Sequence, residues 1–473
     1  MGVLRKVLRV VLWSVAAVVA IPILIYLAAL ALNWRDQPPS REALALAADE
    51  PASQDVADED NAYVYLLGFG VPRDGDPETA GAARAAWIRK LRGDASLGID
   101  TDPGPKALPE IAELYEPLRD LSCAIDGGTS CFEALSGARD RIERTTTEQA
   151  WLLDRYTRLL SYAKWADITS GDIRGAYPEV TTILQGRRLY YLHAWLLAAN
   201  GDAEGVRNAL DADLELWRLS LRDSSTVLSK MIAEGRFREH LAWGTLILRR
   251  LPPQARAAAI PASWRRPLSD EERSMARAFR GEWKYAQSTM RAMTFGTMNI
   301  AGTARARSDR DDWRLSALAQ RIDNALAMPF FKVQATLNDH AATLLRLESL
   351  LDVPYAELPT ALERAHEVVE EKPSGIIDAT YNALGRYLIS PGREYMVGYG
   401  LRVADLEGER RAALLAAELR ARDVPLDAVP AAIELDPARD PYTGQPFIWI
   451  PERTAIAFVG LQSDTRGHFE FLY

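Results

Sequence analysis

The N-terminal segment constrains the fold most, because it contains a long run without a single charge. Residues 10–32 read VVLWSVAAVVAIPILIYLAALAL. As a helix, this run is long enough to cross the hydrocarbon core of a bilayer, which is about 30 Å thick. The basic residues Arg5, Lys6 and Arg9 precede it, and a mostly acidic stretch follows it. By the positive-inside rule, we expect residues 1–9 in the cytoplasm and the bulk of the chain in the periplasm, as in a single-pass protein of the cell inner membrane.

The alternative to this signal-anchor is a cleaved signal peptide. The tripeptide Ala29-Leu30-Ala31 fits the small-x-small pattern of a cleavage site. The apolar run exceeds the roughly 7–15 residues of a signal peptide, which favours an uncleaved transmembrane helix. Pro22 kinks such a helix without preventing its insertion. No cysteine lies near the run, so a lipoprotein anchor is excluded.

The rest of the chain has the composition of a globular protein. Hydrophobic residues make up 48% and charged residues 26% of the 473 residues, close to the averages for soluble domains. The net charge of -9 argues against nucleic acid as a partner, because binding to a phosphate backbone needs clustered Lys and Arg. The expected partners are therefore the lipid bilayer, through residues 10–32, and a protein of the cell envelope.

The two cysteines agree with export. Cys123 and Cys131 bracket AIDGGTS, in which two glycines allow a tight reversal of the chain. In an oxidising periplasm we expect a disulfide bond between them, which stabilises the fold by roughly 2.5 kcal/mol. The alternatives are two free thiols or a redox pair, and the spacing differs from the C-x-x-C of redox pairs.

Helical periodicity dominates the chain between the span and the C-terminal segment. Residues 200–202 separate two helical runs, with Gly201 as the left-handed cap of the first helix and Asp202 as the start of the second, which predicts a helical hairpin. The A-x-x-G-D-x-x-G run from Ala198 to Gly205 resembles one tetratricopeptide-type unit, although Val206 stands where that family usually has Ala. The resemblance implies a scaffold of paired helices.

Prolines and capping residues set the expected limits of other helices. Asp60 or Asn61 begins a helix over NAYVYLLGFG, Ser269-x-x-Glu272 forms a capping box, and Pro391 and Pro425 limit a helix over 394–422. One apolar stripe comprises Leu152, Tyr156, Leu159 and Ala163. Tyr381, Tyr387, Tyr395 and Tyr399 are expected to pack in the core and grooves, with an aromatic binding site as the alternative.

The predicted organisation is a linker over 33–60, a helical domain over 61–250, a connector over 251–272, a second helical block over 273–430 and a small β segment over 431–473.

The C-terminal stretch RDPYTGQPFIWIP differs from the helical remainder. Asp440-Pro441 starts a turn and Gly444 permits a left-handed residue there. Two strands then follow, joined at Pro451, and HFEFLY over 468–473 completes a three-stranded meander. The predicted fold class is therefore mainly α: helical hairpins and a bundle behind one transmembrane helix, with a small antiparallel C-terminal β-meander.

This C-terminal stretch and the helix before it resemble the tails of pseudopilins and of many envelope proteins. The matching residues are the structural turn Asp440, Pro441, Gly444 and Pro446. The N-terminus MGVLRKVLRVVLW lacks the pseudopilin cleavage site, so the resemblance implies a folding element and no pilin function. With NWRDQPPS after the anchor and DNAYVYLLGF at the head of the domain, the whole chain resembles uncharacterised membrane-anchored envelope proteins of Gram-negative bacteria.

Sequence motifs indicate no catalytic residue, cofactor or metal site. The S-x-x-K motif Ser161-Tyr162-Ala163-Lys164 lacks the companion motifs of penicillin-binding enzymes and is expected inside a helix. Asp309, Asp311 and Asp312 are interleaved with arginines, which favours a solvated loop over a cation site. The histidines His193, His240, His340, His366 and His468 are scattered, without the spacing of metal ligands.

These observations predict a non-enzymatic scaffold or binding module of the cell envelope. The alternative is an envelope hydrolase that cleaves peptidoglycan or another glycan through carboxylates that no motif reveals. A cleft with two carboxyl groups about 5–10 Å apart, one of them with a raised pKa, favours the hydrolase. An extended groove or a large exposed apolar patch favours the binding module.

Overall fold

A computed structural model of the chain divides into two compact units, each built from segments distant in sequence. The structure describes residues 2–48, 56–91, 101–104, 118, 121, 128–168, 171, 175, 177–294, 326–462 and 467–473. Four helices contribute residues to both units. They are α15 (Ala276–Thr294), α18 (Val333–Leu351), α19 (Leu358–Val369) and α21 (Ala383–Ala421).

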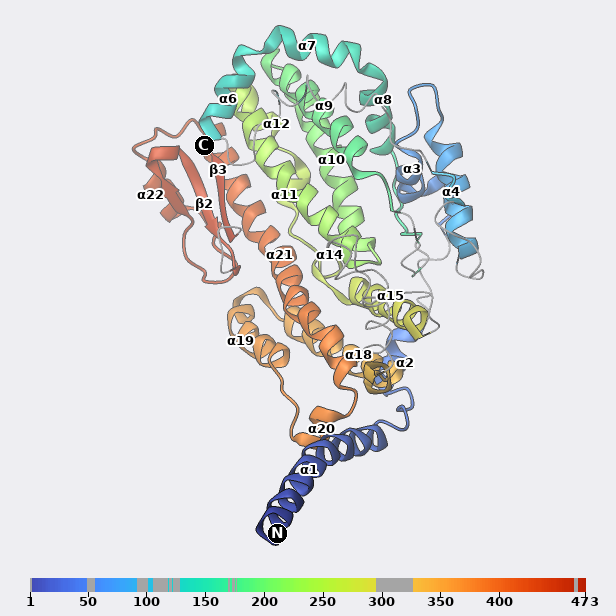
Figure 1. The fold of residues 1–473 in the computed structure, drawn as a ribbon. Coiled ribbons are helices and arrows are strands. Elements are labelled where there is room, and N and C mark those ends of the chain that lie inside the picture. The colour runs from blue at the N-terminus through green and yellow to red at the C-terminus, as the bar shows by residue number, and fades with distance from the viewer. Residues whose placement is uncertain are drawn as a thin grey trace. The chain divides into compact units, whose positions relative to one another are not determined.

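The first unit, residues 1–48, 286–346 and 366–395, contains the predicted transmembrane helix. That helix, α1 (Gly2–Leu32), is long and apolar enough to cross a membrane. The short helix α2 (Arg41–Ala47) follows, capped by the Ser40 side chain. The helix α20 (Ile376–Thr380) lies beside the end of α1 (Figure 1). One turn of 3-10 helix, η3 (Met328–Phe330), also belongs to this unit.

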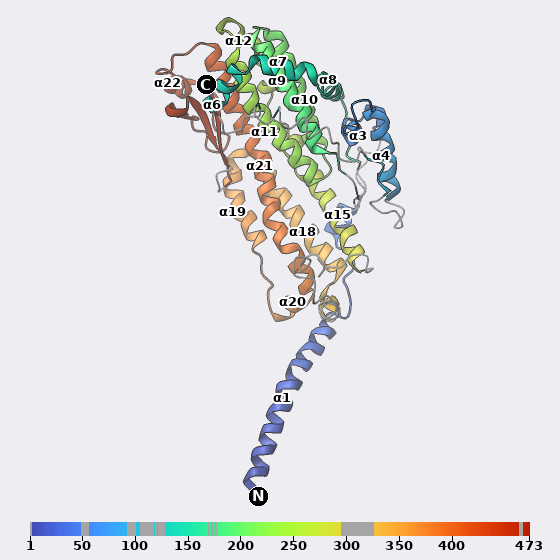
Figure 2. The same ribbon diagram turned by 45° about the horizontal axis from the view of Figure 1, so that its top comes forward.

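In the second unit, residues 49–285, 347–365 and 396–473, three long helices run side by side. They are α9 (Val180–Ala199), α10 (Ala203–Asp223) and α11 (Val227–Arg250), which lie together in both views (Figure 1, Figure 2). Gly201 has a φ of 77° and the Asp202 side chain caps α10, so the predicted hairpin is confirmed. The helices α7 (Arg139–Glu148) and α8 (Ala150–Leu159) pack on α9.

Shorter elements complete the second unit. Asn61 caps α3 (Ala62–Gly68), and Ser269 and Glu272 form the capping box of α14 (Asp270–Arg273), as predicted. The others are η1 (Asp58–Asp60), α4 (Pro77–Leu91), α6 (Gly128–Gly137), α12 (Pro253–Ala259), α13 (Ala262–Arg265), η4 (Tyr355–Glu357), α22 (Val429–Leu435) and η5 (Pro451–Arg453).

The C-terminal segment forms the predicted antiparallel meander. Its strands β1 (Ile448–Ile450), β2 (Ala455–Val459) and β3 (His468–Leu472) pair in the order β1-β2-β3. The central strand is buried from Ala455 to Phe458. A Cβ atom on Gly408 of α21 would lie 2.2 Å from the Phe458 ring, so this glycine allows the sheet to approach the helix closely. The fold is therefore mainly helical with a small C-terminal sheet, as the sequence predicts.

The helix expected to carry the stripe of Leu152, Tyr156, Leu159 and Ala163 is shorter than predicted. It divides into α7 and α8, and Ala163 is exposed beyond the end of α8 at Leu159. Beyond the end of α8, the chain is hydrogen-bonded to the start of α3: the amide of Ala166 donates to the Asn61 side chain at 3.0 Å, and the amide of Ala62 donates to the Lys164 carbonyl at 3.0 Å. Ala163 was therefore wrongly placed in the stripe, while Leu152, Tyr156 and Leu159 are fully buried.

Pro391 does not limit a helix, contrary to prediction, because it lies inside α21. A proline lacks the N–H that would satisfy the carbonyl four residues earlier. Here the Ser390 hydroxyl donates to that carbonyl, on Tyr387, at 3.1 Å, which supplies the missing hydrogen bond. Two of the four tyrosines were also misplaced: Tyr387 and Tyr395 are 72% and 63% exposed, whereas Tyr381 and Tyr399 are half-buried.

The close packing of α3 against α4 generates a stability prediction. A Cβ atom on Gly81 would lie 2.0 Å from the Val64 carbonyl oxygen. We therefore expect Gly81→Ala to lower the free energy of unfolding by about 1–3 kcal/mol. Gly235→Ala, which meets nothing within 4 Å on α11, is the matched control and is expected to raise it by about 0.5–1 kcal/mol. Denaturant unfolding followed by circular dichroism measures both, and equal effects would contradict the close approach.

Candidate functional site

The second unit holds a buried carboxylate that binds side chains from three other helices. Asp213 on α10 accepts hydrogen bonds through Oδ1 from the Tyr156 hydroxyl at 2.6 Å and from Arg187 Nε at 3.0 Å. Its Oδ2 accepts from Arg187 Nη2 at 2.8 Å and from the Tyr191 hydroxyl at 2.7 Å, and lies 2.8 Å from His240 Nδ1. All five side chains are buried. The carboxylate is thus saturated with partners.

The protonation state of His240 follows from its two partners. The Trp264 indole N–H donates to His240 Nε2 at 2.8 Å. An indole only donates, so Nε2 must accept and Nδ1 must carry the proton that it donates to Asp213. Burial lowers the pKa of His240, with the Asp213 carboxylate opposing that effect. The imidazole is therefore a neutral link between α10 and α13.

Asp213 and Arg187 are both charged despite their burial. Burial alone would raise the pKa of Asp213, but the Arg187 guanidinium and the His240 hydrogen bond outweigh it and hold that pKa well below its usual range. The pair is bidentate, with both guanidinium contacts at 3.0 Å or less. Arg187 also donates to Glu239 at 2.8 Å and to the Arg236 carbonyl at 2.6 Å, so two further donors are satisfied on α11.

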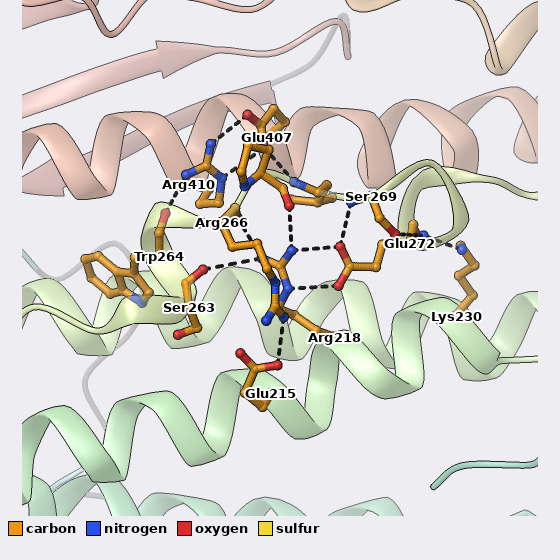
Figure 3. Close-up of polar contacts among 12 residues, drawn as sticks. Glu215, Arg218, Lys230, Ser263, Trp264, Arg266, Ser269, Glu272, Glu407 and Arg410 are labelled. Atoms are coloured by element: carbon orange, nitrogen blue, oxygen red, sulfur yellow. Dashed lines mark hydrogen bonds and ion pairs between the residues drawn. The ribbon is translucent and has the colours of Figure 1, made fainter. Parts of the chain in front are cut away.

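A second charged cluster joins α10 to the proline-rich connector (Figure 3). Arg218 binds Glu272 with two contacts of 2.8 Å. It also donates to the Arg266 carbonyl at 3.0 Å and to the Pro267 carbonyl at 2.6 Å. Glu272 accepts in turn from the Ser269 amide at 2.7 Å, so one carboxylate completes the capping box and binds Arg218.

Lys230 is the buried amine of this cluster. Its Nζ donates to the carbonyls of Leu221 at 2.8 Å and Glu272 at 3.0 Å. Burial lowers the pKa of Lys230 to about 7, although Asp352 and Glu272 oppose the effect. A nearly neutral amine can act as a nucleophile or base. Its two partners here are backbone carbonyls and its side chain is buried, so it links α11 to the end of α10 and to α14.

Arg410 and Glu407 of α21 bind the same connector from the other side (Figure 3). Arg410 donates to the Trp264 carbonyl and, at 2.7 Å, to Glu407. Glu407 accepts from the Leu268 amide at 3.1 Å. The connector therefore receives backbone hydrogen bonds from α10 and α21.

Three buried carboxylates gather around Arg238, between α11 and α21. Arg238 donates to Glu409 at 3.0 Å and forms a 2.7 Å ion pair with Glu234. Asp405 accepts from the Tyr442 hydroxyl at 2.7 Å and from the Leu461 amide at 3.0 Å. Burial raises the pKa of Glu234 to about 7 and that of Asp405 to about 7. These are the carboxyl groups with the proton affinity of a general acid.

A small cavity lies between α3, α9, α10 and α11. Its volume is about 30 Å³ and its walls are mainly apolar, with Trp165 and Trp217 among them. Three buried polar atoms on its walls have no hydrogen-bond partner: the Tyr63 hydroxyl, the Ser220 hydroxyl and Arg236 Nε. A water needs about 10–15 Å³ of such space, so the cavity has room for about two waters. It is too small for a metabolite.

The turn that begins at Asp440 positions the tyrosine that donates to Asp405, one of the three carboxylates near Arg238. Asp440 Oδ1 accepts from the amides of Tyr442 at 2.8 Å and Thr443 at 3.0 Å, and Gly444 has a φ of 68°. This geometry directs the Tyr442 hydroxyl to Asp405. The turn that begins at Asp440-Pro441 and continues to Pro446 thus ties the β segment to α21.

Other candidate residues from the sequence do not come together. Ser161 and Lys164 lie in the loop after α8, and not inside a helix as predicted; the Ser161 hydroxyl donates to the Arg158 carbonyl at 2.8 Å, and Lys164 pairs with Asp60 at 2.9 Å. Cys131 is buried, but Cys123 lies outside the described residues, so the disulfide bond stays a prediction. Asp309, Asp311 and Asp312 also lie outside them.

Among the described residues, no three His, Cys, Asp or Glu side chains lie close enough together to form a metal-ligand set. Burial lowers the pKa of His340 to about 4, and it lowers the pKa of His193 as well. Both therefore stay neutral near pH 7.

Sequence reasoning missed the Asp213 cluster, although a signal existed. Val206, Leu210, Leu214 and Trp217 define the apolar face of α10, and Asp213 falls on that face. A charged residue on an apolar face needs a buried partner. The identity of that partner, Arg187 on another helix, could not be read from spacing.

No known protein family, curated protein or solved structure matches this chain. The resemblances to a tetratricopeptide unit, to pseudopilin tails and to envelope proteins therefore stay predictions.

The Asp213 cluster predicts a large loss of stability on removal of its charge. Asp213→Asn leaves Arg187 buried without a counter-charge, and we expect the free energy of unfolding to fall by about 3–5 kcal/mol. Glu78→Gln, which removes the exposed partner of Arg158, is the matched control and should cost about 0–1 kcal/mol. Urea denaturation compares the two variants. A loss at Asp213 no larger than that at Glu78 would contradict a charged pair.

The shifted pKa values of Glu234, Asp405 and Lys230 give a combined contribution to stability that is smallest near pH 7, whereas the lowered pKa of His340 acts in the opposite direction below its ordinary value of 6.5. In the folded chain, Glu234 and Asp405 stay protonated up to about pH 7. In the unfolded chain, they lose their protons above their ordinary pKa values of 4.5 and 3.8. Stability therefore falls as pH rises toward 7. Folded Lys230 loses its proton near 7, whereas the unfolded chain keeps it up to 10.5, so stability rises again above 7.

Thermal unfolding between about pH 5 and about pH 9 tests this prediction. Glu234→Gln should flatten the acidic limb alone, and Lys230→Met should flatten the alkaline limb alone. A profile that neither variant changes would show that these groups titrate normally.

Proposed function

We propose that the protein is a non-enzymatic scaffold or binding module of the cell envelope. It is anchored in the inner membrane by α1 with its helical domain in the periplasm. The apolar side chains of α1 support the anchor, because none of the most apolar window is covered by the rest of the chain. Arg5, Lys6 and Arg9 at its start support a cytoplasmic N-terminus. The predicted disulfide bond between Cys123 and Cys131 suits the same compartment.

The use of buried charge is the observation that carries the scaffold proposal. Asp213, His240, Glu272 and Lys230 have the chemistry of acids, bases or nucleophiles, yet each is buried and hydrogen-bonded to a neighbouring helix or to the connector. Such pairs select one packing arrangement, because any other leaves a buried charge unpaired. A protein that presents a fixed helical surface benefits from that selectivity.

The raised pKa values of Glu234 and Asp405 favour the second candidate, an envelope hydrolase acting on peptidoglycan or another glycan. A glycosidase must admit a sugar between its two carboxyl groups. Both side chains are buried, and Asp405 is fully inaccessible. Their burial beside Arg238 and Tyr442 therefore supports a structural role over a catalytic one.

Partner capture on the correct side of the membrane tests the proposal. Cells that express the full chain with a C-terminal reporter are crosslinked, and the protein is solubilised, captured and analysed by mass spectrometry. We expect the reporter to be active as an exported protein and one envelope protein to co-purify stoichiometrically. The matched control inverts the N-terminal charges, Arg5→Glu, Lys6→Glu and Arg9→Glu, which should retain the domain in the cytoplasm and abolish the capture.

Two results would contradict the scaffold proposal. In the first, the variant with inverted N-terminal charges captures the same envelope protein, although its reporter is now active in the cytoplasm. The second is release of soluble fragments from isolated peptidoglycan by the purified full chain. If Asp405→Asn or Glu234→Gln abolished that release, the hydrolase would replace the scaffold.

A further inference from the structure

The residues directly after α1 are hydrogen-bonded to a segment of the same unit that is distant in sequence. Asn33, the residue after α1, is buried. Its side-chain amide donates to the Thr380 carbonyl at 3.0 Å, and its Oδ1 accepts from the Asn382 amide at 2.8 Å. The Tyr381 hydroxyl donates to the Arg35 carbonyl at 3.3 Å. The C-terminal end of α20 is therefore held at the level where α1 ends.

The other end of α20 carries two of the most exposed apolar side chains of the chain. Ile376 and Ile377 are 86% and 69% exposed. Ile376 precedes Thr380 by four residues of helix, so it lies on the order of 6 Å along α20 from the residue that Asn33 binds. The polar zone of each leaflet is roughly 5–8 Å deep. Both isoleucines are thus within reach of a bilayer that α1 crosses.

A second segment lies beside the last turns of α1. The Tyr26 hydroxyl donates to the Leu326 carbonyl at 3.2 Å, and the rings of Tyr26 and Phe330 meet edge to face with centroids 5.7 Å apart. Tyr26 precedes Leu32 by six residues, so this segment lies about 9 Å before the end of the helix. Leu326 is 50% exposed there. Residues 326–330 therefore flank the span itself.

We propose that residues 326–330 and Ile376 and Ile377 form a lipid-contacting collar around the exit of α1 from the bilayer. The inference rests on the proposed membrane anchor and adds a second, peripheral membrane contact to it. The occupant is the bilayer because the collar is continuous with α1, whose apolar surface needs lipid.

The charges next to the collar are compatible with a lipid surface. Asp378 on α20 pairs with Arg386 at 2.7 Å. Pairing reduces the repulsion that an acidic side chain meets near anionic headgroups. The collar thus combines exposed apolar side chains with a neutralised acid.

Depth-dependent quenching tests the collar on the full chain. An environment-sensitive fluorescent amino acid replaces Ile376, and the protein is reconstituted in vesicles of phosphatidylethanolamine and phosphatidylglycerol that contain a doxyl-labelled lipid. The matched control carries the probe at Leu435 of α22, which is also 86% exposed in the structure. A third variant carries it at Ile21, in the middle of α1. Iodide serves as the aqueous quencher.

We expect the doxyl lipid to quench the probe at residue 376 several-fold more than at residue 435, and iodide to show the reverse order. If residue 376 behaves like residue 435 while residue 21 is quenched by the doxyl lipid, the collar is overturned and the anchor stands. If residue 21 is not quenched by the doxyl lipid, the anchor fails and the collar with it.

Discussion

The carboxylate of Asp213 is the interaction on which the helical packing of the second unit depends. It binds Tyr156 on α8, Arg187 and Tyr191 on α9, and His240 on α11, all in the buried core. Desolvating two charges costs several kcal/mol per ion, so such a pair adds little net stability. Its effect is selectivity, because α8, α9, α10 and α11 can satisfy the charges in one register only.

The same physical logic explains the arginines around the connector. Prolines at 252, 253, 261 and 267 interrupt the helices between α11 and α15. Broken helices leave backbone carbonyls without intrahelical donors. Arg218 donates to the carbonyls of Arg266 and Pro267, and Arg410 donates to that of Trp264. The guanidinium groups thus supply donors to backbone carbonyls of this connector, and Glu272 and Glu407 neutralise them.

Local features of this fold could be predicted from sequence, and long-range features could not. The apolar helix, the hairpin at Gly201, the capping box at Ser269 and the C-terminal meander each depend on residues close in the chain. The segment after α8 binds instead to Asn61, about a hundred residues earlier. Pro391 was misjudged because the Ser390 hydroxyl compensates for it. The partners of Asp213 likewise come from other helices, at spacings that no pattern encodes.

The hydrogen bonds of Asn33 show that the segment directly after α1 is not a flexible linker. Its amide donates to the Ala29 carbonyl at 2.9 Å, which caps α1, and the same group reaches Thr380 and Asn382. Asp36 accepts from the amides of Gln334 and Ala335 at the start of α18, at 2.9 and 3.0 Å. A flexible linker would let α1 rotate and tilt independently of the rest of the chain. These bonds instead fix the end of the helix to two distant segments of its own unit, so a change in the tilt of α1 must also move residues 334–338 and 380–382.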